Sequence, residues 1–375
     1  MRGTLSVSFC LLSLVSTVFA GCKKVPLQEL RVPLSGTNLE WPCNSTKNIY
    51  VSSGRYIPRN VIVTRMQMYK DEAIVALPRL KPGVPFTLGV VSLHKKGNCK
   101  IAPFPCWAIQ EEGNCEALQS VIDIVLDVQD VLWVLDSGIV NTLTQPIKRC
   151  SPKVVAIDVK SGRVVKVVNI EPFMTDESHL QNLIVDYAPD GNVFLYISDP
   201  PTRTIIAYNV IAERGARLSL PRAVSLGSNQ RDLMCMCLAR KSDFTPVVYF
   251  SYMNCSRVFS IKAEFLRRGT ISNNVVDVGS KPGKFVGLGG DNGSNLFFRR
   301  KGESDIYMWN AETNFRPENC ILVEKGDEYR MPTQVVPGYK KLMWTLESNF
   351  QDYIQDTVPC SGTSVLIRPI VKQCE

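Results

Sequence analysis

Few residues of this chain have the types and spacing that hydrolytic or metal chemistry requires. There are two histidines, His94 and His179, so a Ser–His–Asp triad or a zinc site would need one of them. The Gly-x-Ser-x-Gly turn that presents a nucleophilic serine does not occur. We therefore expect both histidines to be structural or surface groups, and we expect no metal ion and no other cofactor.

Two aspartates offer a different chemistry. Asp136 and Asp199 each end a short apolar strand, and in some propeller enzymes acids at such positions hold a central Ca²⁺ through carboxylate oxygens. The alternative is that each carboxylate caps the turn after its strand. An aspartate does not recur at the corresponding positions elsewhere in the chain, which favours turn capping.

The N-terminal residues predict the compartment. Arg2 precedes an apolar stretch from Leu5 to Val18, and Val18-Phe19-Ala20 has the residues that a signal peptidase reads. We expect residues 1–20 to be a signal peptide and the protein to be secreted. An uncleaved anchor helix is the alternative, but the apolar stretch is shorter than the roughly 20 residues that a membrane span needs.

The cysteine content fits an oxidising compartment. Thirteen cysteines are present and Cys10 falls in the leader, which leaves twelve for up to six disulfides. Cys235 and Cys237 lie two apart on an expected strand, so we expect both to face one side and to bridge to different partners. Candidate N-glycosylation sites are the three sequons at Asn44, Asn254 and Asn292.

The charge pattern argues against nucleic acid as a partner. The formal net charge is +8, but the basic residues are scattered as short pairs such as Lys95-Lys96, without a continuous patch and aromatic platforms. Weak attraction to acidic glycans or phospholipid headgroups remains open, and a solvated surface is the simpler interpretation. Past the leader, no apolar stretch is long enough to span a membrane.

A short apolar strand recurs along the chain. Its central residues, at intervals of 58, 63, 53, 48 and 46 residues, are Val75, Trp133, Tyr196, Tyr249, Phe297 and Met343. A second apolar strand follows each copy, and several copies come after another β-rich segment that ends in a turn. Repeats of about 50 residues built from such strands are typical of propeller blades, because a closed ring buries the faces that one blade cannot.

We therefore predict an all-β fold, a single six-bladed β-propeller domain over residues 21–375. Residues 21–50 are Pro-rich and irregular, and we expect them to lead in and to close the ring against the last blade. The helical signal is weak, with short turns expected near residues 174–183 and 261–268.

Several strings resemble those of a known family. Residues 78–88 read PRLKPGVPFTL, residues 103–107 read PFPCW, residues 132–138 read LWVLDSG, and residues 150–158 read CSPKVVAID. In that order they are similar to the patterns PR-x-x-x-GVP-x-TL, PYP-x-W, LWVLD-S/T-G and C-P-x-L-x-x-F-D of the yellow and major royal jelly protein family of insects. The chain is identified as a divergent member, because residues 235–240 read CMCLAR where the family has GMALSP.

The resemblance implies two sets of site residues. The family bridges the cysteine pair that matches Cys115 and Cys150, which implies a disulfide between them. Salivary members of the family in blood-feeding flies bind biogenic amines in the propeller channel. Their pocket residues fall on Thr333, Ser348 and Phe350 of this chain, with Ser348 standing where the family has Asn.

Three functions remain open. The first is binding of a small ligand such as an aromatic amine at the channel mouth, where Phe350 would supply a cation–π contact. The second is a dopachrome-converting enzyme, as some yellow members are, which would need a positioned acid or base that the sequence does not identify. The third is a structural, nutritive or developmental secreted protein, like the royal jelly members. We favour binding and name no catalytic residue.

Overall fold

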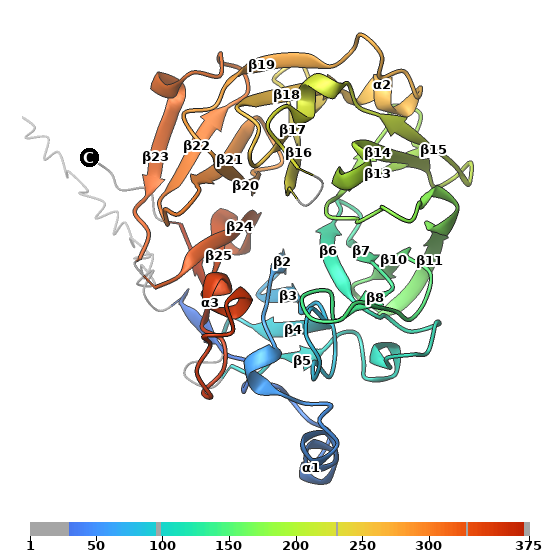
Figure 1. The fold of residues 1–375 in the computed structure, drawn as a ribbon, viewed down its shortest axis with the longest axis vertical. Coiled ribbons are helices and arrows are strands. Elements are labelled where there is room, and N and C mark those ends of the chain that lie inside the picture. Colours follow the sequence, from blue (N-terminus) through green and yellow to red (C-terminus); the bar gives the residue numbers. More distant parts are fainter. Residues whose placement is uncertain (1–29, 95–98, 230–231, 328, 371–375) are drawn as a thin grey trace, which may run out of the picture.

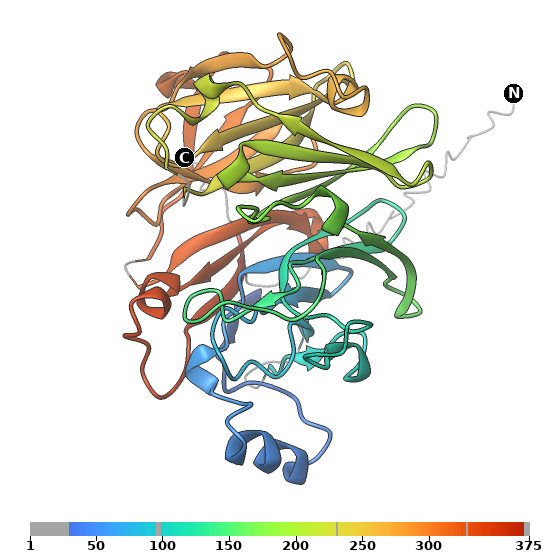
Figure 2. The same ribbon diagram turned by 45° about the vertical axis from the view of Figure 1, so that its right-hand side comes forward.

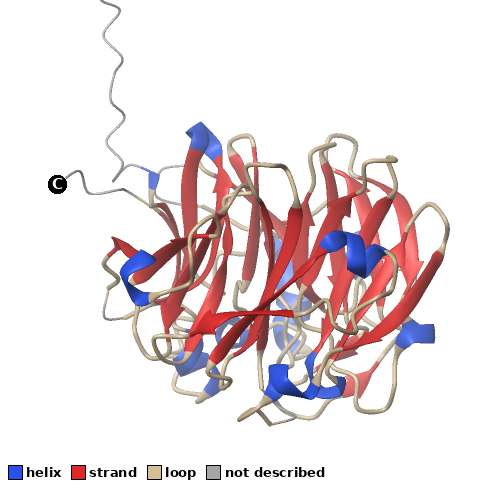
Figure 3. Cartoon of the chain, turned by 90° about the horizontal axis from the view of Figure 1, so that it is seen from above, coloured by secondary structure: helices blue, strands red, loops and turns tan. Residues whose placement is uncertain are grey.

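The computed structural model describes residues 30–94, 99–229, 232–327 and 329–370. Within them, the chain forms six four-stranded sheets arranged as blades around a common centre (Figure 1). Short helices and loops lie at the edges of the blades (Figure 3). The prediction of an all-β, six-bladed propeller is confirmed.

The first half of the ring contains blades one to three, each with its strands in order from the channel outward. Blade one has β2 (Arg65–Tyr69), β3 (Glu72–Ala76), β4 (Leu88–Ser92) and β5 (Ala102–Pro103). Blade two has β6 (Val121–Leu126), β7 (Val131–Asp136), β10 (Lys153–Asp158) and β11 (Arg163–Asn169), with a hairpin of β8 (Ile139–Val140) and β9 (Ile147–Lys148) between β7 and β10. Blade three has β12 (Leu183–Tyr187), β13 (Val193–Asp199), β14 (Thr204–Asn209) and β15 (Arg214–Ser219).

The second half of the ring is built in the same way. Blade four has β16 (Met234–Arg240), β17 (Pro246–Tyr252), β18 (Arg257–Lys262) and β19 (Val276–Ser280). Blade five has β20 (Phe285–Gly290), β21 (Asn295–Arg300), β22 (Ile306–Asn310) and β23 (Cys320–Glu324). Blade six has β24 (Met331–Gly338), β25 (Leu342–Ser348), β26 (Val365–Pro369) and β1 (Val32–Leu34).

The strands predicted from the repeat are the second and third strands of the blades. In blade two, β7 and β10 pair antiparallel with Leu135 opposite Val154, and nearly all their residues are buried. Such strands consist mostly of Val, Ile and Leu because neighbouring blades cover both of their faces. The outer strand β11 exposes Val165 and Val167, because it forms the edge of its sheet.

Blade six contains both ends of the described chain. Its outer strand β1 pairs antiparallel with β26, with Val32 opposite Ile367, so hydrogen bonds between the N- and C-terminal strands complete the ring. After β1, the chain runs to α1 (Asn44–Ser52), which projects beyond the blades (Figures 1 and 2). The leader proposed for residues 1–20 lies outside the described residues.

Helices are few and short. Of the two predicted turns, the second contains α2 (Ala263–Arg267), and a single 3-10 turn at Glu171–Phe173 lies just before the first. The sequence did not predict α1 or α3 (Phe350–Ile354). In the part of the chain that the structure describes, no helix is long and apolar enough to cross a membrane.

Candidate functional site

The first strands of the six blades surround the centre of the ring (Figure 1). Together with residues from the inner parts of blades four and five, they line a cavity of about 420 Å³. Its walls combine apolar residues such as Leu126, Leu288 and Phe297 with a small number of polar side chains. We call the end of this channel where the first strands begin mouth A, and the opposite end mouth B. This cavity is the candidate ligand site.

A partly buried ion pair lies in the channel wall near mouth A. Arg65 Nε lies 3.2 Å from Asp123 Oδ1, and the same carboxylate accepts hydrogen bonds from the backbone N–H groups of Ile124 at 3.0 Å and Leu183 at 2.8 Å. Burial raises the pKa of the Asp123 carboxyl, while Arg65 and the backbone donors act in the opposite direction. Sequence reasoning missed this pair, because its members come from different blades.

Side chains also connect neighbouring first strands around the channel. Gln334 Oε1 of blade six accepts the Met66 backbone N–H of blade one at 2.6 Å, and Gln67 Nε2 donates to the Ile124 carbonyl of blade two at 3.0 Å. Each bond satisfies a polar group that would otherwise be unpaired at the channel wall. The arrangement fixes the spacing of the strands that carry the polar channel residues.

The three residues expected to bind ligand all lie at the mouth A end of blade six. Thr333 on β24 lines the channel, and its hydroxyl donates to the Leu346 carbonyl at 3.2 Å. Ser348 is fully buried at the end of β25, opposite Met331, and lies outside the lining residues. Phe350 begins α3 outside the lining, half-buried and stacked on Tyr353 with ring centroids 5.9 Å apart.

Two thiols form part of the channel wall. Cys235 and Cys237 on β16 are both lining residues on one side of their strand, as the sequence predicted, but the expected bridges to different partners are not formed and both are thiols. They pack against the glycines of β20, where a Cβ on Gly287 would lie 3.1 Å from the Cys235 sulfur and one on Gly290 would lie 3.2 Å from the Cys237 sulfur. Burial raises the pKa of both thiols, that of Cys237 to about 12.

These thiols should react slowly with iodoacetamide in the folded protein. The thiolate is the nucleophile, and at pH 8 a pKa of about 12 leaves about a thousandfold less thiolate than an ordinary cysteine has. We expect Cys237 to be alkylated at least about a hundredfold more slowly than Cys360, which is exposed, and at an equal rate after denaturation. Time-resolved alkylation with peptide mass spectrometry measures both rates, and comparable rates in the folded protein would contradict this assignment.

The two aspartates at strand ends, Asp136 and Asp199, accept hydrogen bonds from backbone N–H groups. Asp136 accepts hydrogen bonds from the N–H groups of Gln119 and Ser120, both at 2.8 Å, and of Gly138 at 3.0 Å. Asp199 accepts from the His179 N–H at 2.8 Å and from nearby hydroxyls. These contacts favour turn capping, and within the described residues no three His, Cys, Asp or Glu side chains are grouped to hold a metal ion.

The two histidines lie apart from each other. Both are exposed. Partial desolvation of the imidazole lowers the pKa of His179, and His94 Nε2 lies 3.1 Å from Asp71 Oδ2. Asn44 and Asn292 are exposed, so their sequons stay candidate glycosylation sites. Asn254 is a poorer candidate, because its Nδ2 donates to Asp232 Oδ1 at 3.0 Å.

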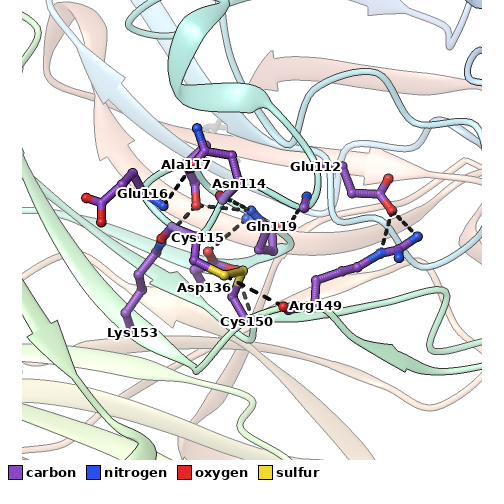
Figure 4. The surroundings of a disulfide bond; sticks show 12 residues. Glu112, Asn114, Cys115, Glu116, Ala117, Gln119, Asp136, Arg149, Cys150 and Lys153 are labelled. Atoms are coloured by element: carbon purple, nitrogen blue, oxygen red, sulfur yellow. Dashed lines mark hydrogen bonds and ion pairs between the residues drawn. A yellow bond between two sulfur atoms is a disulfide. The ribbon is translucent and has the colours of Figure 1, made fainter.

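The disulfide between Cys115 and Cys150 is confirmed (Figure 4). It joins the segment before β6 to the segment before β10, across a sequence separation of 35 residues. Lys153 Nζ donates to the carbonyls of Cys115 and Ala117 beside it, and Arg149 pairs with Glu112 at 3.0 Å. The bridge therefore holds together two loops of blade two at the mouth A side of the ring.

Comparisons with known proteins identify relatives of this chain. The family model described as major royal jelly protein matches residues 119–369. Major royal jelly protein 7 of Apis mellifera is 29% identical over 304 residues, which cover 73% of this chain and 65% of that protein. Protein yellow of Drosophila melanogaster is 22% identical over 388 residues, covering 95% of this chain and 71% of that protein.

One relative carries an enzyme's name. Dopaminechrome tautomerase of Drosophila melanogaster is 29% identical over 175 residues, which cover 45% of this chain and only 38% of that protein. The identities of 22–29% mark distant relationships. The family model nevertheless covers well over half of the chain. The chain belongs to the major royal jelly protein family, which includes the yellow proteins, as a divergent member.

Proposed function

We propose that this protein is secreted and binds a small aromatic amine in its channel, at mouth A. The observation that carries the proposal is the central cavity, whose lining is mostly apolar and includes a buried carboxylate, Asp123, near one end. Its volume of about 420 Å³ lies within the range of about 300–1,000 Å³ that is usual for small-molecule sites. One relative is named for dopaminechrome, a small compound derived from dopamine, which supports a small ligand.

The polar groups would orient the ligand. An ammonium group gains most where a carboxylate is shielded from water, and the Asp123 carboxylate already has a cationic neighbour in Arg65 at 3.2 Å. The amine would share that carboxylate, with the Thr333 hydroxyl as a second polar contact. The aromatic ring would lie against the apolar wall. Ser348 and Phe350 lie at the same end of blade six but outside the cavity lining, and we propose that the half-buried Phe350 ring extends the site there.

The variant Phe350→Ala tests whether the Phe350 ring contacts the ligand at mouth A. If the Phe350 ring faces the ammonium group, its loss should weaken dopamine binding by about five- to thirtyfold, equivalent to about 1–2 kcal/mol. Thr333→Val should weaken binding by about tenfold or less, because one hydrogen bond is lost. Isothermal titration calorimetry on the secreted protein measures both.

The matched control is Phe244→Ala. Phe244 is 84% exposed in the turn between β16 and β17, at the mouth B side of the ring. Its removal should leave the dissociation constant unchanged. Unchanged binding in Phe350→Ala would remove Phe350 from the site, and unchanged binding in both Phe350→Ala and Thr333→Val would contradict the placement at mouth A.

A further inference from the structure

The N-terminal arm, residues 35–57, crosses the place where the ring is closed. The arm follows β1, which belongs to blade six, and then lies along the outer edge of blade one. There Leu39 pairs with Ile101 in a parallel bridge, with the Glu40 N–H donating to the Ile101 carbonyl at 2.9 Å and the Ile101 N–H to the Asn38 carbonyl at 2.7 Å. The arm thus connects the last blade to the first.

Two cysteines lie where these neighbouring segments continue. Cys43 lies four residues after Leu39, and Cys106 lies five residues after Ile101. A second contact shows that the segments stay together, because the rings of Trp41 and Trp107 have centroids 5.4 Å apart. Cys43 and Cys106 are both exposed thiols, so other side chains do not cover them.

The segment after Cys43 has little else to hold it. The helix α1 has nine residues and none of them is buried. Helices of this length are marginal in water unless tertiary contacts stabilise them. The Tyr50 ring of this helix contacts the rings of Trp41 and Trp107, with centroids 5.2 Å and 6.1 Å away. A covalent attachment at the start of the helix would fix the whole segment.

We propose that Cys43 and Cys106 form a disulfide that joins the N-terminal arm to blade one and so secures the closure of the ring. The oxidant is a disulfide of the secretory compartment, either glutathione disulfide or the active-site disulfide of an oxidoreductase. The Cys43 thiolate attacks that disulfide and releases one thiol. The Cys106 thiolate then displaces the second thiol from the mixed disulfide, so that one protein disulfide forms and one external disulfide is reduced to two thiols.

The order of attack follows from the surroundings of Cys43. Its sulfur is at the N-cap of α1, where the side chain and backbone N–H of Thr46 hydrogen-bond to it and lower its pKa. These contacts favour the Cys43 thiolate, the form that attacks a disulfide. Hydrogen bonds and apolar packing hold β1 against β26, and the bridge would add a second covalent attachment of the arm that follows β1 to blade one.

Peptide mapping under non-reducing conditions tests the bridge. The full-length protein, secreted from insect cells, is blocked with iodoacetamide, deglycosylated and cut with trypsin and Glu-C. Glu-C cleaves after Glu111 and Glu112, which separates Cys106 from Cys115. We expect residues 41–47 to be found linked to residues 101–111. Alkylation of both thiols, or linkage of Cys43 to any other cysteine, would overturn the proposal.

Cysteine variants distinguish a covalent bond between Cys43 and Cys106 from two thiols that only lie near each other. Native trypsin cleavage at Lys47 in α1 should be about tenfold faster in Cys43→Ser and in Cys106→Ser, and no faster still in the double variant, because each change opens the same link. Cys360→Ser, which removes a different exposed thiol, should cleave like the wild type. Acceleration in only one of the two single variants would contradict a shared bond.

Discussion

Replacing Arg79 by methionine should lower the free energy of unfolding by about 3–5 kcal/mol. The Arg79 side chain is 2% exposed, and its guanidinium donates to backbone carbonyls in three surrounding segments. The acceptors are the carbonyls of Val84, Pro85, Gln110, Leu118 and Gln119. Methionine fills part of the volume but satisfies none of these carbonyls, so several buried acceptors would lose their partners.

Arg79 holds the loop between β3 and β4 against the segment that enters blade two, next to the disulfide. Urea denaturation followed by circular dichroism measures the effect, with Arg149→Met as the control. Arg149 pairs with Glu112, but the Arg149 side chain is 40% exposed. Its replacement should therefore lower the free energy of unfolding by less than about 1 kcal/mol. If Arg79→Met were as stable as Arg149→Met, the guanidinium would not hold the loops together.

Removing the Cys115–Cys150 disulfide should cost roughly 3–4 kcal/mol of stability. The bridge closes a loop with a sequence separation of 35 residues, and in the chain-entropy model a loop of this size restricts the unfolded chain by that amount. The double variant Cys115→Ala/Cys150→Ala avoids an unpaired thiol. Its denaturation midpoint in urea should fall, and Cys360→Ala, an exposed thiol, should leave the midpoint unchanged.

Dithiothreitol supplies the complementary measurement. Reduction should destabilise the wild type at least as much as the double substitution does, and it should destabilise the double variant less, because only the proposed Cys43–Cys106 bond is left there to reduce. Equal responses of the two proteins would mean that the stabilising bond lies elsewhere in the chain.

The sequence predicted the blades because their signal is local. Strands such as β7 and β10 consist of consecutive apolar residues with turns beside them. Because these strands repeat about every 50 residues, a closed ring of blades can bury the apolar faces of all of them. The cysteine pair was also accessible, through the resemblance of the surrounding strings. The face shared by Cys235 and Cys237 followed from the two-residue period of a strand.

The channel chemistry could not be predicted in the same way. Asp123 and Arg65 are 58 residues apart, and Gln334 reaches Met66 across 268 residues, so neither contact has a local sequence pattern. The same holds for the thiols of β16, whose burial depends on glycines in β20. The position of Phe350 at the start of α3 depends on a helix of five residues that has no strong amphipathic pattern. Sequence reasoning could place these residues in a blade but not against their partners.

The Asp123 carboxylate should distinguish a catechol that carries an ammonium group from one that does not. Dopamine and 4-methylcatechol share the catechol ring, and dopamine adds the ammonium group. Calorimetric titration of the secreted wild type and of Asp123→Asn with both compounds, with circular dichroism to verify the fold, isolates the contribution of the charge. We predict that the wild type binds dopamine more tightly than 4-methylcatechol by about tenfold or more, and that Asp123→Asn loses this preference while still binding the catechol. Absence of dopamine binding to the wild type, or an equal preference in the two proteins, would contradict amine binding at this site.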